Sequence, residues 1–287
     1  MTPRSPDDPI RRVPFSFRRT GLIAQNTLRE AARQRLFNFL LFLSLALVLG
    51  ARWFRDFNFG APELKFLADC GFGAMAFFGA ALTVAATAQL VFSEIENRTA
   101  LTLLAKPVWR AEFILGKFAG IAALAGVFCL LLTGLLAAVL FWREGQLMRE
   151  YPDNFAQGRV VSYGMVALAG LMQWLKLSVL AAFSLLVASF AQTQLFTVVT
   201  GFFILVICHL QYLAQDAYTR GGAWLGRIVA GGIAAVFPNF QVFTLADSLN
   251  AADAPPWWHV LRVGVYAWAY VAVACGLAVY SFRHREI

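Results

Sequence analysis

Residues 118–142 read FAGIAALAGVFCLLLTGLLAAVLFW, a run of 25 residues without a charge. A helix needs about 20 predominantly apolar residues to cross the hydrocarbon core of a bilayer. The run also lacks the alternation of apolar and polar residues that marks the strand of a membrane barrel. It therefore predicts a transmembrane helix.

Similar runs predict five further spans, near 36–54, 70–92, 162–190, 195–213 and 260–282. We therefore expect an all-α integral membrane protein, a single membrane domain with six transmembrane helices. A shorter apolar patch, 228–237, falls in the segment 214–259 between the last two spans, and we expect this segment to be external. The patch is too short to cross a bilayer, so a re-entrant or interfacial helix is the favoured interpretation and a seventh span is the alternative.

The composition excludes several other classes of protein. Hydrophobic residues make up 60% of the 287 residues and charged residues only 14%, whereas soluble domains have about 45–50% and 25%. A chain this long could not cover a water-soluble surface with so few charges. A soluble enzyme, a disordered tail and a secreted disulfide scaffold are therefore poor fits.

The charges predict the orientation of the chain. The leader 1–35, the loop 93–117 and the C-terminus together hold fourteen Lys and Arg and a net charge of +7. The opposite side holds nine basic and nine acidic residues. Because basic loops stay in the cytoplasm, both termini are expected to be cytoplasmic. No basic stripe remains that would indicate a nucleic-acid partner.

The leader also carries a helical pattern over residues 20–36. Its apolar residues recur at helical spacing with arginines between them, which is typical of an amphipathic helix lying on the inner leaflet. A basic, partly disordered leader is the alternative.

The sequence offers no catalytic or metal-binding constellation. Its four cysteines are far apart and none forms a CxxC pair, and its three histidines show no metal-ligand spacing. The single Gly-Lys pair, Gly116-Lys117, has Ala111 and Phe118 where a phosphate loop needs Gly and Ser or Thr. We therefore expect no enzyme activity, no bound metal and no directly bound cofactor.

Lys176 is the one charge in the middle of a predicted span, since Arg52 and Arg262 lie two residues from the ends of theirs. An intramembrane charge is by default a functional candidate, and Gln173 lies three residues earlier on the same helical face. These two residues are candidates for a polar translocation path, while simple tolerance of one lysine by an apolar span is the alternative. His209 and Gln211, near the outer end of the fifth span, are expected to be interfacial anchors.

The most informative loop follows the second predicted span. Residues 94–117 read EIENRTALTLLAKPVWRAEFILGK. Pro107 interrupts helix continuation, so we expect a helix, a break and a second helix. Its apolar residues, rimmed by charges, are typical of a protein interface, although packing beneath the membrane surface is the alternative.

This string resembles the signature of type-2 ABC exporter permeases, and it is most similar to the branch named for copper-enzyme maturation systems. The resemblance implies that the loop forms a coupling helix that docks on a separate ATP-binding subunit. The motif positions implied for this interface are Glu94, Glu96, Arg98, Thr99, Leu101, Leu104, Pro107, Val108, Arg110, Glu112, Gly116 and Lys117.

The same resemblance implies the partners. Two copies of an ATP-binding subunit would use ATP and Mg²⁺, and two permeases would pair as a homodimer or as a heterodimer with a related permease. The location would be a bacterial cytoplasmic (inner) membrane, and the function export of an unidentified substrate. A membrane anchor that transmits ATPase motion without carrying a solute is the main alternative. A secondary transporter or a membrane enzyme ranks lower, because paired intramembrane charges and acid–base clusters are absent.

Overall fold

The computed structural model describes residues 15–51, 53, 63–96, 109–155, 159–220, 228, 231–232, 235–244 and 256–283. These residues are helical and form no strand, which confirms the prediction of an all-α membrane protein. The helices are α1 (Phe17–Ala32), α2 (Arg35–Gly50), α3 (Glu63–Glu96), α5 (Arg110–Glu150), α6 (Tyr163–Phe190), α7 (Gln194–Arg220) and α9 (Trp257–Arg283), with short 3-10 helices η2 (Pro152–Phe155) and η3 (Phe240–Phe243).

Five of these helices, α3, α5, α6, α7 and α9, are long and apolar enough to cross a membrane. The pair α1 and α2 reaches that standard only when joined, and it is bent by 66° at the break between them. The break lies at Gln34, whose backbone is extended. α2 alone has 16 residues, or about 24 Å, against a hydrocarbon core of about 30 Å.

The first two predicted elements therefore differ in length from the helices that form. The leader helix expected over 20–36 begins earlier, at Phe17, and ends at Ala32. In the span expected over 36–54, the α-helix runs from Arg35 to Gly50, and residues 52 and 54 lie outside the described residues. Within the segment 214–259, residues 221–227, 229–230, 233–234 and 245–255 lie outside the described residues. The predictions of an external segment and of a re-entrant or interfacial helix at 228–237 stay untested.

α5 is much longer than the span predicted within it. It has 41 residues, or about 60 Å, roughly twice the thickness of the hydrocarbon core. The charge-free run 118–142 occupies its middle. α5 therefore carries a charged turn or two beyond the apolar run at each end.

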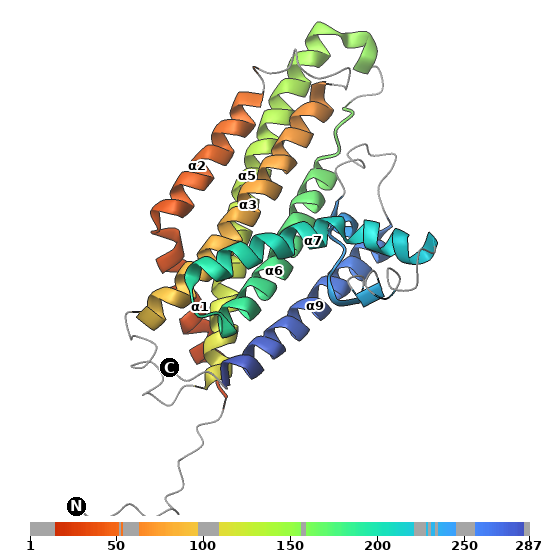
Figure 1. The fold of residues 1–287 in the computed structure, drawn as a ribbon. Coiled ribbons are helices and arrows are strands. Elements are labelled where there is room, and N and C mark those ends of the chain that lie inside the picture. Colours follow the sequence, from red (N-terminus) through yellow and green to blue (C-terminus); the bar gives the residue numbers. More distant parts are fainter. Residues whose placement is uncertain are drawn as a thin grey trace, which may run out of the picture.

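α6 is the central helix of the bundle (Figure 1). It packs against α3, α5, α7 and α9, and most of its side chains are buried. Its exposed residues, which include Ala167 and Leu171, form a narrow stripe, so most of this apolar helix packs against protein and not against lipid.

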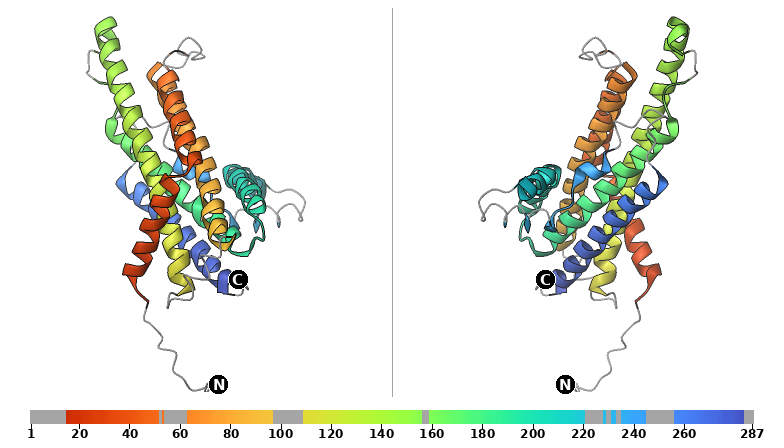
Figure 2. Two further views of the ribbon diagram at one scale, coloured as in Figure 1. Left: turned by 90° about the vertical axis from the view of Figure 1, so that its left-hand side faces the viewer. Right: turned by 90° about the vertical axis from the view of Figure 1, so that its right-hand side faces the viewer.

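α7 runs across the bundle instead of along it. It is steeply inclined to α3 and α5 in Figure 1 and is seen nearly end-on in Figure 2. Gly201 lies where α7 crosses α3 and α6, because a Cβ there would be 2.7 Å from Val84 Cγ1 and 3.4 Å from Ser184 Oγ. A side chain at this position would hold the three helices apart.

The two ends of the bundle differ in which helix termini they gather. The start of α1, the end of α3, the start of α5 and the end of α9 share one end, here called the Glu112 end (Figure 1). The start of α3, the end of α5 and the start of α6 share the other, here called the Arg143 end.

Candidate functional site

Glu112 joins α1 to α5. Its side chain is fully buried and accepts hydrogen bonds from the Ser16 backbone N–H at 2.7 Å and from Arg19 Nε and Nη2 at 3.0 and 2.7 Å. It also accepts the backbone N–H of Trp109 at 3.2 Å, so it caps the start of α5. Glu112 lies six residues before the charge-free run that begins at residue 118.

Two glycines of α5 allow α1 to approach closely. A Cβ at Gly116 would lie 2.7 Å from Ile23 Cβ and 3.1 Å from the Thr20 carbonyl oxygen. A Cβ at Gly120 would lie 2.6 Å from Thr27 Cβ and 2.8 Å from the Ala24 carbonyl oxygen. These separations are too short for any side chain, so the two glycines set the distance between the helices.

Lys117 joins α5 to the last turns of α3. Its Nζ lies 2.6 Å from Glu94 Oε1 and donates to the Leu90 carbonyl oxygen at 3.1 Å. The Lys117 side chain is fully buried and that of Glu94 is 11% exposed. A cation beside the carbonyl end of a helix is also favoured by the helix dipole.

α9 is held at the same end. Arg110 Nη1 donates to the Phe282 carbonyl oxygen at 3.1 Å, and the Phe113 ring stacks on the Phe282 ring with centroids 5.6 Å apart. The first two turns of α5 therefore contact α1, α3 and α9.

Five of the predicted interface residues meet at this Glu112 end: Glu94, Arg110, Glu112, Gly116 and Lys117. For Glu96 only the backbone is described, at the end of α3. Six further positions lie outside the described residues: Arg98, Thr99, Leu101, Leu104, Pro107 and Val108.

Three residues of this set, all in α5, are buried, whereas a docking surface for a partner would have to be exposed. Glu112, Gly116 and Lys117 contact other helices of the same chain and offer no surface to a partner. They instead fix both ends of the segment 97–108, which leaves α3 at Glu96 and joins α5 at Arg110.

Sequence reasoning missed Ser16, Arg19 and Phe282, which complete these contacts. Arg19 lies 93 residues from Glu112 along the chain, and no local spacing connects them. One feature of the sequence could have indicated this contact. The basic leader has few acidic residues, so its arginines would have to pair with carboxylates of other segments.

The sequence model described as ABC-2 family transporter protein matches residues 14–219. This chain belongs to that family. It is therefore a membrane permease subunit of an ABC transporter, the class of transmembrane subunit that works with an ABC ATPase subunit in a lipid bilayer. No curated protein matches the sequence.

The matched region of this ABC-2 permease runs from just before α1 to the end of α7. It therefore includes all the described contacts at the Glu112 end except those made by Phe282. It excludes η3 and α9.

The two candidate translocation residues of the permease lie in the centre of α6. Lys176 is 6% exposed and Gln173 is 8% exposed. Lys176 Nζ lies 5.5 Å from the centroid of the Phe240 ring in η3. Among the described residues, Gln173 Nε2 is buried without a hydrogen-bond partner. The structure thus places both residues inside the protein.

His209 and Gln211 do not lie where the sequence suggested. The His209 ring packs edge-on against Phe240 with centroids 5.4 Å apart, and Gln211 is 4% exposed. They face η3 because α7 crosses the bundle and turns this side inward. Anchoring at a lipid interface is therefore the wrong description of these two residues.

Proposed function

We propose that the permease couples ATP hydrolysis by a separate ATPase subunit to export of a substrate. The geometry at the Glu112 end supports this best, because the segment 97–108 is anchored on both sides by contacts among α1, α3, α5 and α9. A displacement of that segment would move these helices as well, because the buried ion pairs and the close glycine contacts hold them tightly together.

The segment itself carries docking chemistry. Leu101, Leu103 and Leu104 form an apolar cluster, followed by Pro107 and Val108. Apolar residues rimmed by charge suit a groove on a partner protein. ATP and Mg²⁺ would then bind the partner, consistent with a Gly116-Lys117 pair that does not fit a phosphate loop.

We place the Glu112 end in the cytoplasm, where an ATPase would meet it. The excess of Lys and Arg in the leader, in the loop 93–117 and at the C-terminus supports that orientation. Two permeases, identical or related, would assemble with two ATPase subunits in a bacterial inner membrane. The loop motif favours the copper-enzyme-maturation branch of the family.

Association with the ATPase tests this proposal. A tagged permease is purified from mild detergent together with the ATPase encoded beside it, and the Leu104→Glu variant is compared with the wild type. We expect Leu104→Glu to lose most of the ATPase while the permease still elutes as a single species, because a carboxylate cannot enter an apolar groove without a partner.

The matched control is Arg149→Glu, an exposed charge reversal at the Arg143 end. It should bind the ATPase as the wild type does. Retention of both ATPase binding and permease-dependent ATP hydrolysis by Leu104→Glu would refute the proposed coupling role.

A further inference from the structure

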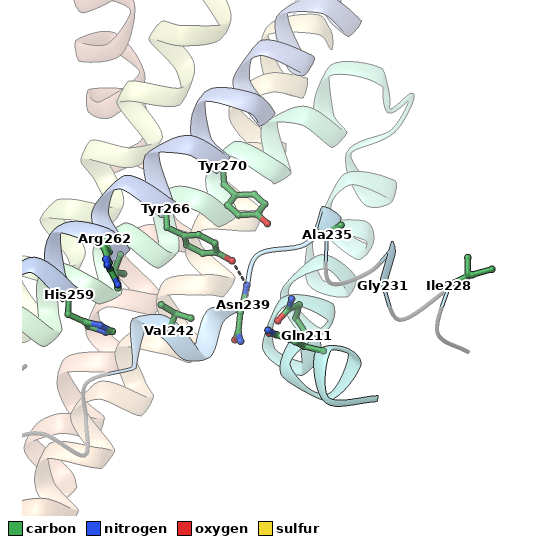
Figure 3. A pocket seen from close by; sticks show the side chains of 12 residues that line it. Gln211, Ile228, Gly231, Ala235, Asn239, Val242, His259, Arg262, Tyr266 and Tyr270 are labelled. Atoms are coloured by element: carbon green, nitrogen blue, oxygen red, sulfur yellow. Dashed lines mark hydrogen bonds between the residues drawn. The ribbon is translucent and has the colours of Figure 1, made fainter. Parts of the chain in front are cut away.

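A cavity of about 960 Å³ lies between α7, η3 and α9, away from the Glu112 end (Figure 3). Volumes of roughly 300–1,000 Å³ are typical of sites for organic ligands. Only Gln211 and Gln215 of its lining fall within the region matched by the family. The family match therefore assigns nothing to this cavity.

The described lining of the cavity carries one formal charge, the positive charge of Arg262. It includes Arg262 and His259 from α9 and no carboxylate. The Arg262 guanidinium lies over the Trp258 ring at 4.2 Å, which holds this exposed side chain near the cavity rim. A ligand that carries a negative charge would meet a positive charge and no acidic competitor on these walls.

The wall between Gln211 and Tyr266 offers hydrogen-bond donors. The Asn239 carbonyl oxygen Oδ1 accepts the backbone N–H of Gln241 at 2.9 Å, which leaves its NH₂ group to donate. The Tyr266 hydroxyl accepts the backbone N–H of Asn239 at 2.9 Å, and this fixes η3 against α9 (Figure 3). Side-chain amide donors of this kind suit carboxylate, phosphate or sulfonate oxygens.

A second cation lies behind the same wall. Phe240 follows Asn239, and its ring lies near both Lys176 Nζ, at 5.5 Å, and the His209 ring, at 5.4 Å. Lys176 forms no ion pair with any described residue. A buried lysine is costly in a membrane protein. A negatively charged ligand near η3 would offset part of that cost, because it attracts the Lys176 ammonium group.

The remaining wall is apolar and aromatic. Val242, Val263 and Tyr270 line it, and the Tyr266 and Tyr270 rings lie 4.9 Å apart. A bare inorganic ion could not use this surface. A molecule with an apolar body and one acidic group could use both parts of the cavity.

We propose that this cavity binds an organic anion with an apolar body, with Arg262 as the direct contact and Lys176 as a deeper positive charge. The inference rests on the proposed function only in that the bound anion would be the exported substrate. Binding itself requires neither ATP nor the partner subunit.

Two fluorescent probes with the same body and opposite charge test the site. Dansylglycine is anionic and dansylcadaverine is cationic, and each is titrated into the purified permease without ATPase or nucleotide. We expect dansylglycine to bind at least tenfold more tightly. We expect Arg262→Gln to weaken its binding roughly tenfold, as loss of a charge-assisted hydrogen bond does.

Two further variants separate charge from shape. Val242→Trp should block dansylglycine by filling the cavity, because Val242 lies on its wall and is 38% exposed. Arg149→Gln removes an exposed charge at the Arg143 end and should leave binding unchanged. Equal binding of the two probes, or wild-type binding by Arg262→Gln and Val242→Trp, would overturn the proposal.

Displacement identifies the source of the anion. Release of dansylglycine by phosphatidylglycerol but not by phosphatidylcholine supports an anionic lipid, and no release by either supports a soluble organic anion. Because the assay omits the ATPase, loss of coupling in Leu104→Glu and loss of probe binding in Arg262→Gln can be observed separately.

Discussion

Lys117 is the residue on which the Glu112 end depends most. It is fully buried, and it pairs with a carboxylate that is nearly so. When one partner of a buried ion pair is removed, the other charge is left uncompensated, whereas removal of both can be close to neutral. The pair therefore specifies how α3 and α5 meet more than it stabilises the chain overall.

Lys117→Met should lower the free energy of unfolding by about 3–5 kcal/mol, because the nearly buried Glu94 carboxylate then loses the cation at Lys117. The double variant Lys117→Met/Glu94→Gln should recover most of that loss. Thermal unfolding of detergent-solubilised protein, followed by size-exclusion chromatography, measures both. Equal losses in the single and double variants would contradict a buried ion pair.

Single residues also show the limit of sequence reasoning. The loop motif predicted that Glu94, Arg110, Glu112, Gly116 and Lys117 belong to one interface. In the structure these five residues lie close together at the Glu112 end. The sequence could not show that Glu112, Gly116 and Lys117 face inward. Their contacts, Arg19, Ile23 and Glu94, belong to other helices, and the order in which helices pack is not encoded in local spacing.

At the scale of elements, two glycines of α5, which have no side chains, allow α1 to pack closely against α5. Gly116 and Gly120 are four residues apart and share one face of α5. Small residues at this spacing allow close packing of membrane helices. α1 is therefore fastened to α5 along its length, and Glu112 with Arg19 closes the end of that contact.

Gly120→Ala should destabilise the protein by roughly 1–3 kcal/mol, since its Cβ would meet the Ala24 carbonyl oxygen, a backbone atom that cannot rotate away. Gly134→Ala, in the same helix, has nothing within 4 Å of the added Cβ and should be neutral. The difference between their apparent melting temperatures measures the effect. A melting temperature for Gly120→Ala that matches Gly134→Ala would contradict close contact of α1 and α5.

Elements were predicted better in their existence than in their ends. The charge-free run 118–142 located α5, but the helix extends to Arg110 and Glu150. The charged ends of this helix are not apolar enough to be recognised as part of a membrane span. However, no proline occurs between Pro107 and Pro152 to interrupt the helix. The crossing of α7 was not foreseeable, because it depends on the contact of Gly201 with Val84 and Ser184.

At the scale of the whole molecule, α3 and α5 are joined at both ends. Lys117 pairs with Glu94 at one end, and Arg143 pairs with Glu63 at 2.6 Å at the other. Beside Arg143, the buried Glu144 accepts the Tyr163 hydroxyl at 2.6 Å, which attaches the start of α6. If the segment 97–108 is displaced, α3 and α5 would move together, and the displacement would reach the Arg143 end of the bundle.

We propose that residues between Glu96 and Trp109 contact the ATPase subunit. A photo-crosslinking amino acid at position 104 tests it in membranes that contain both proteins, with the same amino acid at position 149 as the control. We expect an ATPase adduct from position 104 and none from position 149. A stable complex that gives no adduct at 104, or gives equal adducts at both positions, would contradict it.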